Sequence, residues 1–520
     1  MSTLPWLTVL VAVPLVGALL VAFLPKRPGS ALPKLVAVGV SILTLAVAVA
    51  ITAQYDTGGG MQLTEEHEWI SAFGVHYALG VDGLGLLLIL LTVVLVPIVI
   101  VASWHDADDS SPAAFFAWAL ALEGLSLAVF AATDVFLFYV VFEATLIPAY
   151  FLIGRFGRRG RDLAALKFLM YQLGGGLVML ASVIGLYVVS ARDGDPTYLL
   201  SDLSEIQMST SAERWLFVGF FIAFAVKAPL FPLHTWLADT TEKATPGTSV
   251  LLVCVLDKIG TFGMLRFCLG LFPEASQWAT PVVLVLALIS IVYGALIAIG
   301  QDDILRLIGL TSLSHFGFIT LGIFAFSSQG ASGAILYMVN HGVATAALFL
   351  LAGFLIKRRG TSLISELSGV EQAAPVLAGL FLVAGLATLG LPGLSQFVSE
   401  ILVLIAAFDH AWWAGAVAVT GIVLAAVYVL WMYQRIFTGP TLPTGVPTQA
   451  TEVRTRDLNR REVAVVAPLM VGLVLFGFYP MPLLDVSNPT VDTLLQHVGV
   501  SDDGPVVPAA EPDSAEEGQQ

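Results

Sequence analysis

Nine of the ionisable side chains inside the long apolar segments of this chain are candidates for chemistry. They are Glu123, Glu143, Lys227, His234, Asp257, Lys258, His315, His341 and Glu400. Ionisable groups are rare in membrane-spanning segments because a charge in hydrocarbon is costly, and those that occur usually carry ions or protons. Glutamate, lysine and histidine can each exchange a proton when a neighbouring charge changes. The set therefore indicates a path for protons or cations across a membrane.

The segment 220–239, FFIAFAVKAPLFPLHTWLAD, combines several of these signals. It is long enough to cross a bilayer, but Lys227 lies near its middle and Pro229 and Pro232 follow. Proline lacks an amide hydrogen and clashes with the preceding turn, so we expect the helix to break within residues 228–233. A break in hydrocarbon is tolerated only beside protein or a water-filled cavity. A kinked core helix with a snorkelling lysine is the simpler alternative.

The other central groups suggest how a proton could travel. Glu143 lies midway along its apolar segment, at the depth expected for Lys227, and such a buried pair is stable only when the two charges are close. Lys258 lies in the middle of another segment and is the expected centre of the pathway. His315 and His341 titrate near neutral pH, which suits a relay.

Four residues carry weaker or different signals. Glu400 follows a second expected break, in PGLSQFVSEILVL. Glu123 is as compatible with bracing neighbouring helices as with proton transfer. His234 follows the first break, where a structural capping role is the simpler interpretation. Asp257 projects about 100° away from Lys258 around a helix, which leaves its role open.

Composition defines the elements that must position these groups. The chain has 520 residues, of which 57% are hydrophobic and 12% charged, and its mean hydropathy is +0.89. These values predict an all-α polytopic membrane protein with about fourteen spans, the first of them retained rather than cleaved as a signal peptide. The expected spans are 5–24, 35–53, 79–102, 113–131, 135–153, 166–190, 215–237, 250–271, 281–299, 304–326, 331–356, 375–407, 412–432 and 463–480.

Basic residues gather in alternate loops. Clusters at 26–34, 155–161, 357–359 and 454–461 belong to one side, whereas residues 54–77 on the other side contain no lysine or arginine. The positive-inside rule places the basic loops in the cytoplasm and both termini outside it. Such an arrangement requires an even number of spans.

The second half of the chain repeats the first at an offset of about 165 residues, because the break at Pro229 and Pro232 recurs at Pro392. An odd number of helices separates the equivalent points, which predicts two inverted five-helix repeats, each with a broken helix. We expect an N-terminal three-helix region (1–110), a first repeat (111–272), a second repeat (273–436), a cytoplasmic loop with the last helix (437–482) and an acidic, disordered tail (483–520).

Six stretches resemble the antiporter-like membrane subunits of respiratory complex I. They are GVDGLGLLL, FYVVFEATLIPAYFLIG, AVKAPLFPLHTWLADTTEKATPGTSVLL, TSLSHFGF, NHGVATAALFLLAG and GLPGLSQFVSE. The resemblance extends from about residue 80 to 434, and the KAP-x-x-P-x-H-x-W-L element is the most specific. Length and span number are most similar to the M type; the N type typically has lysine at the position of Glu400.

The resemblance implies a role for six residues. Glu143 and Lys227 match the glutamate–lysine pair of a first half-channel, and Lys258 matches the central lysine. His315 and His341 match the bridging histidines, and Glu400 the terminal carboxylate of a second half-channel. Asp257 is not part of this pattern.

The resemblance also implies partners. FMN, iron–sulfur clusters and a quinone site would belong to other subunits of an NADH:quinone oxidoreductase in a bacterial plasma membrane. L- and N-type membrane subunits and lipids would contact this chain, the peripheral redox arm would act indirectly, and no nucleic acid is implied.

The sequence leaves two alternatives open. Related subunits occur in multi-component cation/proton antiporters and in membrane-bound hydrogenases. The chain itself shows no redox or nucleotide chemistry, since Cys254 and Cys268 are too few to ligate an iron–sulfur cluster and no GxGxxG or P-loop motif occurs. Copurifying flavin and iron–sulfur subunits would favour the oxidoreductase.

Overall fold

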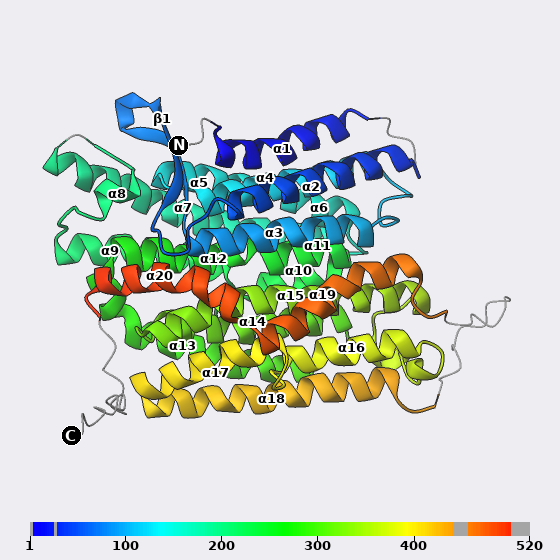
Figure 1. The fold of residues 1–520 in the computed structure, drawn as a ribbon. Coiled ribbons are helices and arrows are strands. Elements are labelled where there is room, and N and C mark those ends of the chain that lie inside the picture. Colours follow the sequence, from blue (N-terminus) through cyan, green and yellow to red (C-terminus); the bar gives the residue numbers. More distant parts are fainter. Residues whose placement is uncertain (1–3, 25–28, 195, 441–455, 501–520) are drawn as a thin grey trace, which may run out of the picture.

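The computed structural model describes residues 4–24, 29–194, 196–440 and 456–500. Long helices run side by side, and a small β-hairpin lies at one end of the bundle (Figure 1). Among the described residues, 11 helices are long and apolar enough to cross a membrane. The chain is thus a mostly helical, multi-pass membrane protein, as composition predicts.

The helices are assigned in chain order. The first six are α1 (Trp6–Ala22), α2 (Ala31–Thr52), α3 (Gly83–Ala102), α4 (Pro112–Ala131), α5 (Val135–Ala144) and α6 (Leu146–Phe156). The next seven are α7 (Arg161–Asp193), α8 (Leu200–Leu203), α9 (Thr210–Lys227), α10 (Thr235–Lys243), α11 (Pro246–Val250), α12 (Lys258–Gly263) and α13 (Pro273–Ile299). The last seven are α14 (Ile304–Ile323), α15 (Ser328–Arg359), α16 (Pro375–Thr388), α17 (Ser395–His410), α18 (Trp412–Phe437), α19 (Arg460–Phe478) and α20 (Met481–Val498).

Both expected helix breaks are present. Helix α9 ends at Lys227 and α10 begins at Thr235, while α16 ends at Thr388 and α17 begins at Ser395. Side chains from the protein replace some of the lost backbone bonds. At the first break, Trp236 Nε1 donates to the Val226 carbonyl at 3.1 Å. A break inside the bundle is therefore stabilised by protein groups, as hydrocarbon would require.

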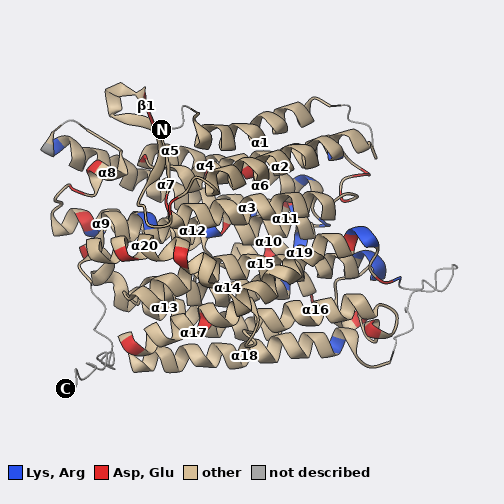
Figure 2. Ribbon diagram, in the orientation of Figure 1, with Lys and Arg blue, Asp and Glu red and all other residues tan. Residues whose placement is uncertain are grey.

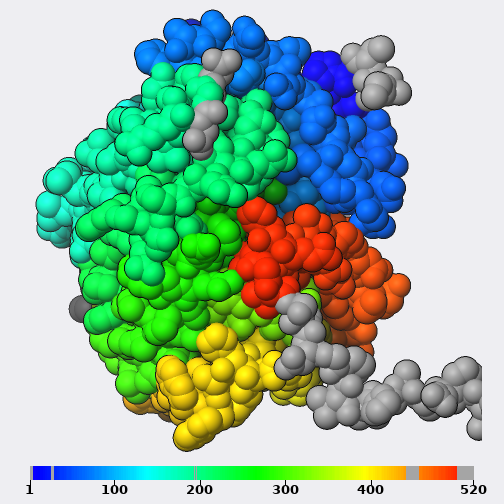
Figure 3. Space-filling model, turned by 90° about the vertical axis from the view of Figure 1, so that its left-hand side faces the viewer, coloured from blue at the N-terminus to red at the C-terminus, as the bar shows by residue number. Residues whose placement is uncertain are grey.

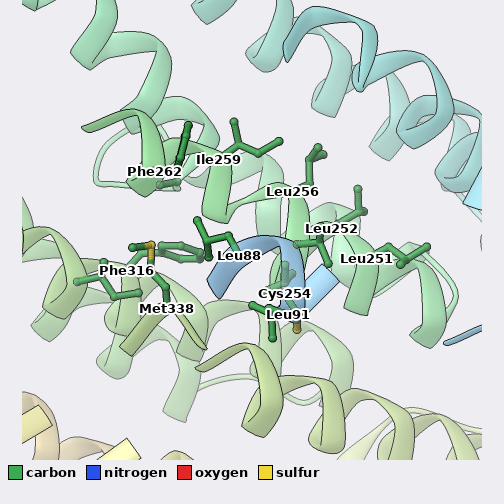
Figure 4. Packing of buried hydrophobic residues seen from close by; sticks show 14 of the residues in the cluster. Leu88, Leu91, Leu251, Leu252, Cys254, Leu256, Ile259, Phe262, Phe316 and Met338 are labelled. Carbon is green, nitrogen blue, oxygen red and sulfur yellow. The ribbon is translucent and has the colours of Figure 1, made fainter. Parts of the chain in front are cut away.

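The central span is irregular in a way that the sequence analysis did not predict. Between α11 and α12 lies the π-helical segment η2 (Leu251–Leu256), and after α12 lies a second one, η3 (Met264–Leu269). Nearly all of the span 246–269 is buried inside the protein, Pro246 and Arg266 being partly exposed. In Figure 4, Leu88 and Leu91 of α3 lie beside Leu252 and Cys254 of this span.

A small β-hairpin accompanies the helices and leaves the all-α class unchanged, but the sequence analysis did not predict it. Strand β1 (Gln62–Ile70) pairs antiparallel with β2 (Val75–Val81). The strands are joined by a 3₁₀ turn, η1 (Ser71–Phe73), and by Gly74, whose φ of +63° suits glycine. Residues 64–70 do not alternate between apolar and polar types, so Gly74 was the only local signal for a turn. Two more 3₁₀ turns, η4 (Ile364–Glu366) and η5 (Val370–Gln372), lie between α15 and α16.

Helix α20 corrects the expectation of a disordered tail from residue 483. It runs to Val498 and buries Val491 and Leu495. Thr490 accepts a hydrogen bond from the Gly83 amide at the start of α3. An apolar face at helical spacing outweighed the acidic composition of this segment. Figure 3 shows the C-terminal helices between the N-terminal segment and the second half of the chain. The rest of the expected tail, 501–520, lies outside the described residues.

Charged residues are most frequent toward the ends of the bundle, and lysine and arginine are prominent near the end of α18 and the start of α19 (Figure 2). At this end of the bundle, carboxylates form ion pairs with basic residues. Arg306 bonds Asp239 at 2.6 Å and Glu242 at 2.9 Å, and Lys357 bonds Asp106 at 2.5 Å. Helix α1 begins and α20 ends at the opposite end (Figure 1).

Candidate functional site

The candidate residues come from different elements and are nearly all buried. Glu123 lies on α4, Glu143 on α5, Lys227 on α9, His234 between α9 and α10, Asp257 and Lys258 at the start of α12, His315 on α14, His341 on α15 and Glu400 on α17. All except Glu143 are at most 4% exposed; Glu143 is partly exposed. The interior of this bundle is therefore unusually rich in ionisable groups.

Lys227 lies in a mixed polar and aromatic environment. Its Nζ donates to Thr145 Oγ1 at 3.2 Å and lies 4.4 Å from the centroid of the Phe142 ring. Glu143 and Lys227 interact electrostatically, but they form no direct hydrogen bond, and Glu143 Oε1 is buried without a hydrogen-bond partner. The expected pair is thus near in space but not in contact, and the sequence analysis missed Thr145.

Lys258 contacts the second half of the chain directly. Its Nζ lies 2.6 Å from His341 Nδ1 and donates to the Val253 carbonyl at 3.3 Å. The ammonium also lies 4.5 Å from the centroid of the Phe316 ring. The Val253 carbonyl belongs to the π-helical η2, where the altered backbone pairing leaves room for a side-chain donor.

A hydrogen-bonded chain continues from the histidines to Glu400. The rings of His341 and His315 lie 5.2 Å apart. His315 Nδ1 lies 2.7 Å from the Tyr337 hydroxyl, which donates to Glu400 Oε1 at 2.8 Å. Protons hop between hydrogen-bonded neighbours. This arrangement can therefore carry a proton from α12 through α15 and α14 to α17. The separation between the two histidine rings is the one step without a direct hydrogen bond.

Tyr337 is a member of this chain that the sequence analysis missed. It lies four residues before His341 on α15, and residues at this spacing share a helix face. That spacing was the available signal. Gln396 and Tyr428 make longer contacts with His315, at 3.4 Å and 3.5 Å, and were also missed.

A glycine packs against the carboxylate of Glu143, and another against that of Glu400. A Cβ on Gly176 of α7 would overlap the Glu143 carboxylate, and one on Gly390 would overlap the Glu400 carboxylate. Gly390 also has a φ of +76°, which other residues rarely adopt. Gly176 therefore makes room for the Glu143 carboxylate.

Three candidates lie outside the chain of contacts. Both oxygens of Glu123 are buried without a hydrogen-bond partner. His234 packs near the rings of Phe231 and Tyr293, with centroids 6.0 Å and 5.4 Å away. Its Nδ1 is buried without a hydrogen-bond partner. Both oxygens of Asp257 are likewise buried and without a hydrogen-bond partner.

One cavity lies away from these residues. It has a volume of about 480 Å³ and is lined by the hairpin, by Leu265 and Arg266, and by Thr490, Thr493 and His497 of α20. Arg266 donates to Asp82 beside it at 2.6 Å. Among the described residues, no cluster of histidine, cysteine, aspartate and glutamate could hold a metal ion.

A buried chain of lysine, histidine, tyrosine and carboxylate groups, held by membrane-length helices with two breaks, defines an ion-translocating membrane protein. Residues 132–425, more than half of the chain, match the family described as NADH:quinone oxidoreductase/Mrp antiporter, TM. The chain belongs to this family of antiporter-like membrane subunits.

Relatives of known name cover almost the whole chain. It is 48% identical to NADH-quinone oxidoreductase subunit M of Mycobacterium tuberculosis, an alignment that covers 98% of this chain and 97% of the relative. It is 35% identical to the subunit of the same name from Rhodobacter capsulatus, over 94% and 96% of the two chains. The similarity to complex I membrane subunits is therefore not confined to a shared domain.

Solved structures share the fold. A chain of respiratory complex I from Thermus thermophilus superimposes with a TM-score of 0.85 at 33% identity, covering 95% of this chain and 100% of that one. A chain of the Mrp complex from Dietzia sp. also gives a TM-score of 0.85, at 23% identity and with 96% and 100% coverage. The second similarity shows the fold alone.

Proposed function

We propose that this chain is the M-type proton-translocating membrane subunit of an NADH:quinone oxidoreductase. The observation that carries the proposal is the chain of contacts Lys258–His341–His315–Tyr337–Glu400, which links the middle of the bundle to the second break. Similarity to subunits M over almost the entire chain, at 48% and 35% identity, supports the oxidoreductase assignment over the antiporter and hydrogenase alternatives.

The residues of the first half would supply protons to Lys258, the central lysine. Glu143 is partly exposed and interacts with Lys227, so a change in its charge alters how strongly Lys227 holds a proton. Released protons would pass to Lys258 and on through His341, His315 and Tyr337 to Glu400. Glu123 is buried on α4, and we assign it a lesser role in the first half.

The finer architecture is also a proposal: fourteen spans with two inverted repeats, in the ranges 111–272 and 273–436. Two local equivalences support it. Asp134 accepts from the Leu137 amide at the start of α5, and Asp303 accepts from the Leu305 and Arg306 amides at the start of α14. Each aspartate also forms an isolated β-bridge, with Leu199 or with Leu363.

The assembly follows from the assigned class. The chain would act in a bacterial plasma membrane beside antiporter-like L- and N-type subunits and lipids, with both termini outside the cytoplasm. FMN, iron–sulfur clusters and quinone would be bound by other subunits, so that this chain is part of an enzyme without holding its redox centres. Purifying the tagged chain tests this assembly. Flavin and iron–sulfur subunits should copurify, whereas only small membrane subunits would support the antiporter alternative.

The function is tested with Glu143→Ala. Without the carboxylate, Lys227 is a buried ammonium that lacks its nearby opposite charge and releases its proton. We expect assembled complex with NADH:quinone turnover and proton pumping lowered on the order of a hundredfold, the scale of one lost proton-transfer group. Glu274→Ala, at an exposed position of α13, is the matched control. Normal coupled turnover in assembled Glu143→Ala complex would contradict the proposal.

A further inference from the structure

Asp257 is a buried acid that the chain of contacts does not use. Its side chain is completely buried, and neither carboxylate oxygen has a hydrogen-bond partner. A carboxylate without partners in a protein interior is strongly unfavourable, so its presence requires an explanation beyond packing. The residue lies in the middle of the central span 246–269, beside Lys258.

Asp257 and Lys258 lie on different sides of the central span. Lys258 contacts His341 and Phe316 of the second half. Gly260, one turn after Asp257, packs against α9, where a Cβ would collide with the backbone of Phe224 and Ala228. Asp257 thus lies between the side that faces the end of α9 and the side that faces α14 and α15.

Electrostatics places Asp257 between the two buried lysines. Its carboxylate interacts with the ammonium groups of both Lys258 and Lys227. Lys227 is the last residue of α9, immediately before the Ala228 backbone that Gly260 contacts. From the sequence, the separation of about 100° between Asp257 and Lys258 left the role of Asp257 open. In the structure, this separation lets Lys258 face the second half while Asp257 lies nearer to the end of α9.

The local backbone and the charge balance support a working role. Asp257 follows the π-helical η2, and its amide donates to the Leu252 carbonyl at 2.9 Å in the wider π-helical pattern. Such segments occur frequently at functional sites. Two buried ammonium groups also need two opposite charges, and Glu143 supplies only one of them.

We propose that Asp257 is the proton carrier that connects Lys227 to Lys258, and hence the first half of the protein to the second. An N–H bond of the Lys227 ammonium breaks as an O–H bond forms on Asp257, leaving a neutral amine and a neutral carboxylic acid. The O–H bond then breaks as an N–H bond forms on the neutral Lys258 amine. No oxidant or reductant is consumed. The inference rests on the proposed proton-translocating function.

The test uses the complete complex reconstituted in liposomes. Asp257→Asn keeps the size of the side chain but cannot carry the proton, so pumping and coupled turnover should fall on the order of tenfold or more. Asp257→Glu should restore most of both. Ser249→Ala is the matched control, because Ser249 lies on the same span and is also fully buried with an unpartnered oxygen; it should pump normally.

A second measurement separates a proton carrier from a fixed counter-ion. The infrared difference spectrum during NADH turnover should contain a carboxylic-acid band that Asp257→Asn removes and Asp257→Glu shifts. If the complex with Asp257→Asn does not assemble, the shift of the carboxylic-acid band in Asp257→Glu still tests whether residue 257 carries the proton. An unchanged spectrum, or normal pumping by Asp257→Asn, would overturn the inference. Loss of pumping in Lys258→Ala with normal Asp257→Asn would overturn this step alone, whereas normal pumping in both would overturn the proposed function.

Discussion

Tyr337 joins His315 to Glu400 with one hydroxyl group. It lies 2.7 Å from His315 Nδ1 and 2.8 Å from Glu400 Oε1, and it is completely buried between α14 and α17. A phenol can accept a proton on one side while releasing one on the other, so it can relay without changing its own net charge. The contact gives a continuous hydrogen-bonded connection from His315 to Glu400.

Tyr337→Phe removes this link while leaving the ring in place. We expect pumping to fall about tenfold or more, because the nearest donor and acceptor lose their shared partner. Tyr428→Phe is the control, since its hydroxyl lies 3.5 Å from His315 Nε2, beyond a normal hydrogen bond. Proton uptake by liposomes containing each complex is the measurement. Equal losses in the two variants would mean that Tyr337 is not the specific link.

At the scale of elements, close helix approach determines where the carboxylates lie. Helix α7 passes Glu143 at Gly176, whose missing Cβ provides the space that the carboxylate occupies. The neighbouring Gly174 has open space where its Cβ would be. Two glycines two residues apart on one helix therefore have different roles, because successive side-chain directions are separated by about 100°.

Gly176→Ala should displace the Glu143 carboxylate and weaken its interaction with Lys227. We expect assembled complex whose pumping is reduced on the order of tenfold, together with a modest loss of stability of about 1–3 kcal/mol from overpacking. Gly174→Ala is the matched control and should leave pumping unchanged, or slightly raise stability. Thermal unfolding and proton uptake distinguish the variants. Identical behaviour of the two would show that the glycine does not position Glu143.

At the scale of the whole molecule, charge distinguishes the two ends of the bundle. Loops distant in sequence meet at the basic end through ion pairs such as Arg158 with Asp303 at 3.6 Å and Arg435 with Asp302 at 3.3 Å. Helix α1 begins and α20 ends at the opposite end of the bundle (Figure 1). Positive loops are generally retained in the cytoplasm during insertion, so this asymmetry supports the proposed orientation, with the basic end of the bundle in the cytoplasm.

A reporter that is active only outside the cytoplasm should be active when fused to Gln520. The same reporter fused after Gly360, which follows the basic end of α15, should be inactive. Enzymatic activity of both fusions in intact cells is the measurement, with a cytoplasm-specific reporter at each point as the control. Activity of the cytoplasm-specific reporter at Gln520 would reverse the proposed topology and weaken the inverted-repeat proposal with it.

The sequence by itself determined the class of protein and most of the candidate residues. Apolar segments of membrane length, with lysine, histidine and glutamate inside them, are informative without a partner because hydrocarbon penalises each such group separately. Proline acts locally in the same way, so the break after Lys227 followed from Pro229 and Pro232 alone. These signals depend on one segment and its solvent.

Only the tertiary structure decided which of these groups meet. Lys258 and His341 are 83 residues apart in the chain, and no local rule brings their nitrogens together. Tyr337 and Thr145 have ordinary residue types, so their contacts give them a role that composition could not. The hairpin was missed because the buried residues of β2 are recognised only against neighbouring elements. Helix α20 was missed because the acidic composition of the segment concealed its apolar face. Asp257 shows the same limit, since a direction around a helix has meaning only when the helices on each side are known.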